Sequence, residues 1–186
     1  GSHKHSSQRI LDAETMLVSA TSEPTVFTAR TASIHEVYET MRAETGRNLN
    51  AGQRTLTEHF LQSGALLAVG VGPAGTGKTT SMKAVVQAWQ NEGRSVVALA
   101  PSAVAAETLG EEVGVTGLTL ASLTYPWRGL GGSRPGTLPA GIDIAPGTML
   151  LVDEASLAST LDLAAVVEIA KERGAVVRLL GDPAQL

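Results

Sequence analysis

The sequence has 186 residues, a formal net charge of −4 and a pI of about 5.6, and 43% of its residues are hydrophobic. This composition is that of one soluble globular domain, and its acidic balance counts mildly against a compact nucleic-acid-binding module, which usually carries a basic surplus. The absence of cysteine excludes a disulfide framework and a thiolate metal site. It fits a reducing compartment, so we expect a cytoplasmic protein without a membrane span.

The N-terminal quarter of the chain carries helical patterns and no chemical motif. Residues 1–7 resemble an expression scar and are expected to be a disordered start. Residues 8–47 are expected to form a helical lead-in, and apolar residues at helical spacing predict its first helix over about 8–18.

Two further helices are predicted before the first strand. The second helix is expected to begin at a capping box of Ser33 and Glu36 and to end at Gly46. The third is expected to begin near Asn50 and to end at Gly64, with one amide on an otherwise apolar face.

From residue 66 onward, apolar runs of strand length alternate with helical patterns. Buried strands are predicted at 66–71, 96–100, 149–152 and 176–180, and a long surface loop at 129–147. Strands that alternate with helices indicate an α/β fold, in which a mostly parallel sheet has helices on both faces.

A glycine-rich motif follows the first predicted strand. The run Gly72-Pro73-Ala74-Gly75-Thr76-Gly77-Lys78-Thr79, followed by Thr80, satisfies G-x-x-x-x-G-K-[ST]. Its glycines allow backbone N–H groups to surround phosphate oxygens at the start of a helix. Lys78 is expected to contact the β- and γ-phosphates, and the Thr79 hydroxyl to bind Mg²⁺. The motif therefore predicts a P-loop and a bound nucleoside triphosphate with magnesium.

Two acids follow the third predicted strand. Asp153 and Glu154 come directly after four apolar residues, which places them at the carboxyl edge of a parallel sheet, where ligands bind in open α/β folds. We expect Asp153 to hold the Mg²⁺ shell and Glu154 to polarise the attacking water. The alternative is a solvated acidic strand end, which the upstream P-loop disfavours.

The last residues follow the fourth predicted strand at the same edge. Gln185 in the run Gly181–Leu186 could place an amide on the γ-phosphate and so report its presence. Gly-Asp-Pro is also good turn chemistry, so a simple turn is the alternative.

These motifs together resemble motifs I, II and III of superfamily 1 DNA helicases of the RecD-like branch. The chain is most similar to the helicase region of conjugative relaxases of the TraA/TraI type (MobF family), and the resemblance covers residues 48–186. It implies a RecA-like three-layer P-loop NTPase lobe with motifs Q, I, Ia, II and III. It further implies ATP and Mg²⁺ as cofactors, single-stranded DNA as partner, 5′–3′ translocation and a role in plasmid transfer.

The resemblance also assigns roles outside these three motifs. Gln53 corresponds to a glutamine that reads the adenine edge, although a glutamine bonded to nearby backbone at a helix end is the alternative. Residues 100–106 resemble motif Ia, where Ser102 and backbone N–H groups would contact DNA. Tyr125 and Trp127 are either base-stacking platforms or packing residues.

The family motor has a second lobe whose arginines stabilise charge on the γ-phosphate. This chain ends at motif III, and Arg178 lies in mid-strand and is a poor substitute. We therefore expect the isolated fragment to bind Mg-ATP, to hydrolyse it slowly and to unwind nothing. The alternatives are a P-loop phosphotransferase for a small molecule and a non-catalytic nucleotide-binding module.

Overall fold

The computed structural model describes residues 2–72 and 77–181, and their side chains from residue 5 onward. Within these ranges a five-stranded parallel sheet has the order β1-β5-β4-β2-β3. The strands are β1 (Leu67–Val71), β2 (Val96–Ala100), β3 (Gly117–Thr119), β4 (Met149–Val152) and β5 (Val176–Gly181). The predicted α/β class with a parallel sheet is therefore confirmed.

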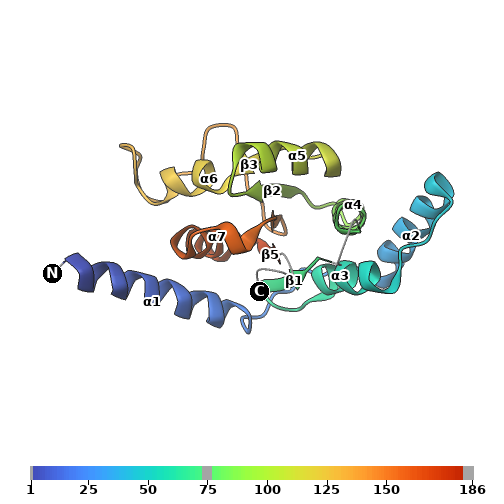
Figure 1. Cartoon of the computed structure of the whole chain (residues 1–186), viewed down its shortest axis with the longest axis horizontal. Helices are drawn as coiled ribbons and strands as arrows, with labels where there is room; N and C mark the ends of the chain where they lie inside the picture. The colour runs from blue at the N-terminus through green and yellow to red at the C-terminus, as the bar shows by residue number, and fades with distance from the viewer. Residues whose placement is uncertain (1, 73–76, 182–186) are drawn as a thin grey trace.

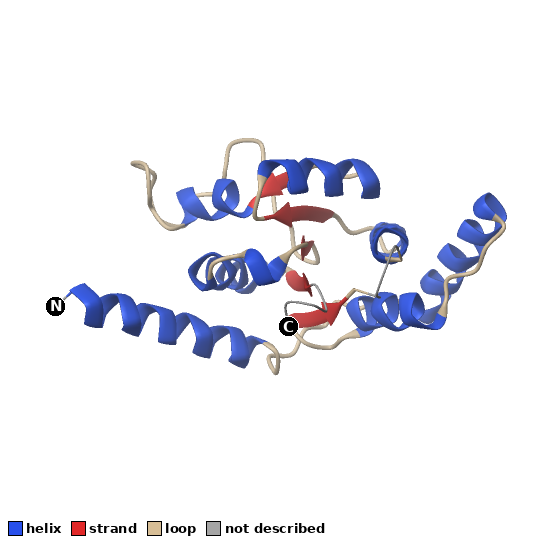
Figure 2. Cartoon of the chain, in the orientation of Figure 1, coloured by secondary structure: helices blue, strands red, loops and turns tan. Residues whose placement is uncertain are grey.

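Helices cover both faces of this sheet (Figures 1 and 2). They are α1 (Ser2–Ala20), α2 (Thr31–Thr45), α3 (Ala51–Gln62), α4 (Lys78–Asn91), α5 (Ala103–Val113), α6 (Leu120–Trp127) and α7 (Thr160–Arg173), with a 3₁₀ turn η1 (Ala155–Leu157). Residues of α2 to α5 form one apolar cluster against the sheet, and residues of α1, α6 and α7 form the other. The three-layer arrangement follows from strands that are apolar on both sides.

Helix α1 is longer than the sequence pattern indicated. It begins at Ser2, whereas the prediction placed its start near residue 8, and it runs along α7 (Figure 1). Ala13 and Ala20 are buried on this side, and Leu11 and Val18 are exposed. In the part of the chain that the structure describes, no helix has the length and apolar character needed to span a bilayer.

The predicted capping box of Ser33 and Glu36 is wrong. Helix α2 begins at Thr31 with Arg30 as its N-cap residue, so Ser33 lies inside the first turn. The cap comes instead from Glu92, a residue distant in sequence. Its carboxylate accepts hydrogen bonds from the backbone N–H of Arg30 at 2.8 Å and from the Ser33 hydroxyl at 2.7 Å. A helix N-terminus is a favourable place for such an anion.

This cap predicts an acid-sensitive contribution to stability. Burial raises the pKa of the Glu92 carboxyl, but the hydrogen bonds from Ser33 and Arg30 and the charge of Arg30 outweigh it, so the net pKa lies below 4.5. The stabilisation is therefore complete above about pH 4.5 and is lost as the pH falls through the lower pKa of the folded state. We expect Glu92→Gln to reduce the free energy of unfolding by about 1–2 kcal/mol at neutral pH.

Urea denaturation of both proteins across the acid range checks this expectation. The difference between them should shrink as the solution becomes more acidic. An equally large difference in strongly acidic solution would contradict the assignment of the cap to the ionised carboxylate.

Two short elements escaped the sequence analysis, strand β3 and helix α6. Strand β3 has three residues, and Gly117 packs so closely on the Ala106 backbone that a Cβ would collide there. Helix α6 contains Pro126, a residue that usually interrupts helices. It begins at Leu120, after the N-cap residue Thr119, whose hydroxyl accepts the Ser122 N–H. Trp127 at its end is buried in the core, which confirms the packing alternative for that residue.

One charged side chain lies fully inside the fold. Arg178 projects from the middle of β5 and has 0% exposure. Its guanidinium donates to backbone carbonyls at 2.8–3.2 Å, those of Phe60, Ser63, Ala65, Leu66 and Val177. Burial lowers the pKa of Arg178 to about 10, which leaves it charged at neutral pH. Through these hydrogen bonds, Arg178 connects the C-terminal end of α3 and the α3–β1 connection to strand β5.

Candidate nucleotide-binding site

The centre of the site is an ion pair at the carboxyl edge of the sheet. Lys78 is the first residue of α4, and Asp153 directly follows β4. The Lys78 ammonium lies 3.1 Å from each carboxylate oxygen of Asp153. The Lys78 side chain is 39% exposed and that of Asp153 is 14% exposed, so the lysine is the partner that solvent or a ligand can reach. Asp153 thus lies at the carboxyl edge of the sheet, as the sequence analysis expected, and its role toward Mg²⁺ stays a prediction.

Glu154 has an unusual backbone conformation. Its φ of 53° is the one positive value among the non-glycine residues that the structure describes. Such a conformation costs about 1–3 kcal/mol for a residue with a Cβ, and it persists only where neighbouring contacts hold it. Here the Glu154 N–H donates to Asp153 Oδ1 at 2.8 Å. Asp153 receives Lys78, and Glu154 is the N-cap residue of η1.

The start of the P-loop is fixed to the end of β5. The Gly72 N–H donates to the Gly181 carbonyl at 3.3 Å, so the residues that precede Lys78 are joined to the strand that leads to Gln185. A Cβ at Gly72 would lie 3.3 Å from Cδ of Lys78. Glycine at this position therefore leaves room for the Lys78 side chain beside it.

Gln53 is held by backbone groups on both sides. Its side-chain oxygen accepts the Asn50 N–H at 2.8 Å, and Asn50 in turn accepts the Gln53 N–H, which completes a capping box for α3. The Gln53 amide nitrogen donates to the carbonyl of Gly77 at 3.2 Å. The amide thus makes the backbone contacts of the alternative interpretation and joins the start of α3 to the P-loop. Its role toward adenine stays a prediction.

Thr79 has a partner that sequence reasoning missed. Its hydroxyl donates to Oε2 of Glu112 at 3.3 Å, across from α4 to the last turn of α5. Thr80 follows on the same turn of α4. The one signal in the sequence was a pair of acids, Glu111 and Glu112, at the C-terminal end of a helix, where carboxylates are disfavoured.

The donor atoms fit a magnesium ion. A threonine hydroxyl and an aspartate carboxylate are oxygen ligands of the kind that Mg²⁺ takes, alongside water and phosphate oxygens. Thr79 directly follows Lys78 at the start of α4, and the Asp153 carboxylate contacts the Lys78 ammonium. Among the residues with described side chains, no cluster of three or more His, Cys, Asp or Glu forms a complete protein cage for a metal. The two residues therefore suit an ion that also needs ligands from a bound phosphate chain.

Comparison with known protein families agrees with this geometry. Residues 48–186 match the family described as AAA domain. The chain belongs to the AAA domain family. The match begins just before α3 and includes every residue of the site described above. Together with the names of its relatives, this match shows that the AAA domain is a helicase-like nucleotide-binding module.

Named relatives of this AAA domain are much longer proteins. A probable conjugal transfer protein TraA of Sinorhizobium fredii is 37% identical over 138 residues, which cover 74% of this chain and 12% of that protein. The conjugal transfer protein TraA of Rhizobium radiobacter is 37% identical over 139 residues, again 74% of this chain and 12% of the relative. The ATP-dependent RecD2 DNA helicase of Deinococcus radiodurans is 38% identical over 127 residues, 67% of this chain and 16% of the helicase. The predicted resemblance to RecD-like helicases and conjugative relaxases is confirmed.

Several predicted site residues lie outside the described part of the AAA domain. They are Pro73, Ala74, Gly75 and Thr76 of the P-loop and Gln185 after β5. The motif Ia residue Ser102 is described, and its side chain accepts the Ala105 N–H as the N-cap of α5. Tyr125 is half exposed at 51%, in contrast to the buried Trp127.

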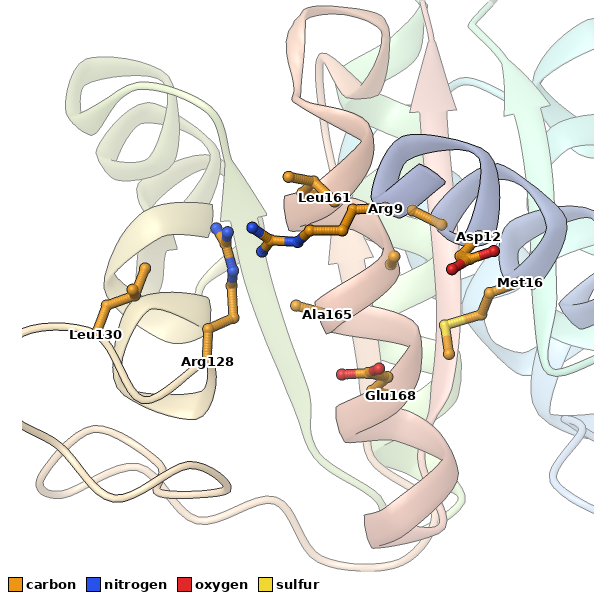
Figure 3. Close-up of a pocket in the computed structure, with 10 residues that line it drawn as sticks. Arg9, Asp12, Met16, Arg128, Leu130, Leu161, Ala165 and Glu168 are labelled. Carbon is orange, nitrogen blue, oxygen red and sulfur yellow. The ribbon is translucent and has the colours of Figure 1, made fainter. Parts of the chain in front are cut away.

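A cavity of about 360 Å³ lies between α1, α6 and α7, on the side of the sheet opposite to α4. In Figure 3 the guanidinium groups of Arg9 and Arg128 point toward one another at one end of it, and Glu168 and Asp12 lie on the α7 and α1 sides. None of the residues that line this cavity belongs to the P-loop or to the Asp153 turn. It is therefore separate from the candidate nucleotide site.

Proposed function

We propose that this AAA domain is the ATP-binding and ATP-hydrolysing lobe of a DNA helicase motor that acts in conjugative plasmid transfer. The contact of Lys78 with Asp153 carries the proposal, because it brings a P-loop lysine and a strand-end acid to one edge of a parallel sheet. The names of the relatives support the helicase and the conjugation parts. Translocation in the 5′–3′ direction, single-stranded DNA as partner and a cytoplasmic location belong to the same proposal.

In the proposed function, Lys78 changes partner when a nucleotide binds. Its ammonium would leave Asp153 for the β- and γ-phosphate oxygens, a move that its partial exposure permits. Asp153 and the Thr79 hydroxyl would then hold Mg²⁺, which offsets negative charge on the phosphate oxygens when it is bound. The ion pair in the structure thus holds both side chains close to their proposed working positions.

Glu154 is the proposed general base. It would accept a proton from the water that adds to the terminal phosphorus, while the bond from that phosphorus to the bridging oxygen breaks and ADP leaves. Its left-handed backbone supports this role, since strained conformations cluster at functional sites. Gln53 as the adenine contact and Gln185 as the γ-phosphate sensor complete the proposed set.

In this proposal, the arginine that stabilises negative charge on the γ-phosphate belongs to a part of the protein outside these 186 residues. Among the described residues, the hydrogen bonds and ion pairs of Lys78, Thr79 and Asp153 involve no arginine. An arginine on the γ-phosphate accounts for about 10³–10⁵ in rate in related phosphoryl transfers. Slow hydrolysis by the isolated chain is the corresponding expectation.

The test is Glu154→Gln in the longer protein that contains this domain. We expect ATP hydrolysis to fall by about 10²–10³-fold, because general bases contribute factors of this size, while nucleotide affinity stays nearly unchanged. Steady-state phosphate release and nucleotide titration measure the two quantities. Glu107→Gln is the matched control, since Glu107 is an exposed acid on α5 away from the turn. Unchanged hydrolysis in Glu154→Gln would favour a non-catalytic nucleotide-binding module.

A further inference from the structure

The contact between Thr79 and Glu112 has no place in the proposed chemistry so far. The Thr79 hydroxyl donates its proton to Oε2 of Glu112 at 3.3 Å. Glu112 lies in the last turn of α5, a helix that follows β2, so the contact joins two segments 33 residues apart. Among the described residues, Thr79 is the one hydrogen-bond partner of the Glu112 side chain.

Local structure does not explain a carboxylate at this position. The carbonyl end of a helix carries partial negative charge, so an acid in the last turn of α5 is disfavoured. Glu111 stands beside it and adds a second negative charge. The side chain of Glu112 is exposed, so it contributes little apolar burial. The contact with Thr79 is the feature that distinguishes Glu112 from its neighbour.

The direction of the hydrogen bond matters for a metal ligand. A hydroxyl has one proton and two lone pairs, and it binds a cation only through a lone pair, so its proton must point elsewhere. The Thr79 hydroxyl donates that proton to Glu112, and the donors described for the Asp153 carboxylate are Lys78 and the Glu154 N–H. Glu112 accepts it and leaves the Thr79 lone pairs free.

We propose that Glu112 is a positioning residue for the magnesium site, which acts by orienting the Thr79 hydroxyl. This inference rests on the proposed function, because it concerns the same Mg-nucleotide site. Residues that hold a metal ligand by hydrogen bonding typically change metal affinity by about 10–100-fold when they are removed. A carboxylate accepts this hydrogen bond more strongly than a neutral amide would, so the full orienting effect requires both the acceptor oxygen and the charge.

The experiment measures the Mg²⁺ concentration that half-saturates ATP binding to the chain, by calorimetric titration at fixed nucleotide. We expect Glu112→Ala to raise this concentration by about 10-fold. Glu112→Gln keeps an acceptor oxygen and loses the charge, so it should fall between Glu112→Ala and the unchanged chain. Glu111→Ala is the matched control, which removes an adjacent acid without a described hydrogen-bond partner, and it should leave the concentration unchanged.

Two further readouts separate positioning from a structural role. The thermal unfolding midpoint of Glu112→Ala should equal or exceed that of the unchanged chain, since an unfavourable helix-end charge is gone. In a Thr79→Ala background, Glu112→Ala should have no further effect on the Mg²⁺ requirement, because the hydroxyl it orients is absent.

The outcomes distinguish this inference from the function on which it rests. If the unchanged chain shows no Mg-dependent ATP binding, the proposed function and this inference both fail. If binding is Mg-dependent and Thr79→Ala weakens it, but Glu112→Ala matches the unchanged chain, only the role of Glu112 is overturned. An effect of Glu112→Ala that persists in the Thr79→Ala background overturns it as well.

Discussion

Replacement of Lys78 by alanine is expected to weaken Mg-ATP binding by about 100-fold or more, which corresponds to about 2.7 kcal/mol. The lysine is the positive side chain placed where the phosphate chain would lie, and it is pre-positioned by two contacts of 3.1 Å with Asp153. Removal of one partner of a hydrogen-bonded charge pair also leaves the other charge unpaired, and Asp153 is only 14% exposed.

Calorimetric titration with Mg-ATP measures this loss. Lys83→Ala is the matched control, because Lys83 lies on the same helix and is exposed, with no described hydrogen-bond or ion-pair partner. It removes the same charge from α4 and should change the affinity by much less. Equal affinities of the Lys78→Ala and Lys83→Ala proteins would mean that phosphate binding does not occur at the P-loop.

Replacement of Arg178 by alanine is expected to have the largest effect on stability, a loss of about 3–5 kcal/mol. The fully buried guanidinium donates to five carbonyl groups, and alanine would leave these acceptors without it in a dry interior. The side chain is also among the largest of the fully buried ones, so its removal creates a cavity. These two contributions act in the same direction.

Thermal or urea unfolding measures the effect. For a domain of this size, about 1 kcal/mol corresponds to about 2–4 °C, so the midpoint should fall by about 6–20 °C. Arg42→Ala is the control, because Arg42 is exposed on α2 and its side chain has no described partner. A fall of only a degree or two in Arg178→Ala would show that the carbonyl contacts contribute little to the fold.

The sequence predicted those parts of the molecule that depend on local pattern. Four strands were recognised because each is a short apolar run, and their alternation with helices implied a parallel sheet. The expectation that all four are buried was wrong for β1, because Val69 and Val71 are exposed on one of its faces. The parallel arrangement then placed Lys78 and Asp153 at one edge, although 75 residues separate them. Apolar runs and strand direction can therefore place two residues at the same edge of the sheet even when they are far apart in the sequence.

Contacts between distant segments could not be predicted in this way. Glu92 caps α2 from 59 residues beyond Ser33, and a local Ser-x-x-Glu pattern concealed that arrangement. Glu112 reaches Thr79 only because α5 ends close to the start of α4. Such pairings depend on how helices pack on the sheet, which no spacing in the sequence encodes.

The central claim is that a magnesium-bound triphosphate occupies the sheet edge between the P-loop lysine and the acid after β4. The most direct measurement is a calorimetric titration of the unchanged chain with ATP, first with Mg²⁺ and then with a chelator in its place. We predict saturable binding that weakens markedly when the metal is removed. Binding of equal strength with and without Mg²⁺, or no binding at all, would contradict the claim.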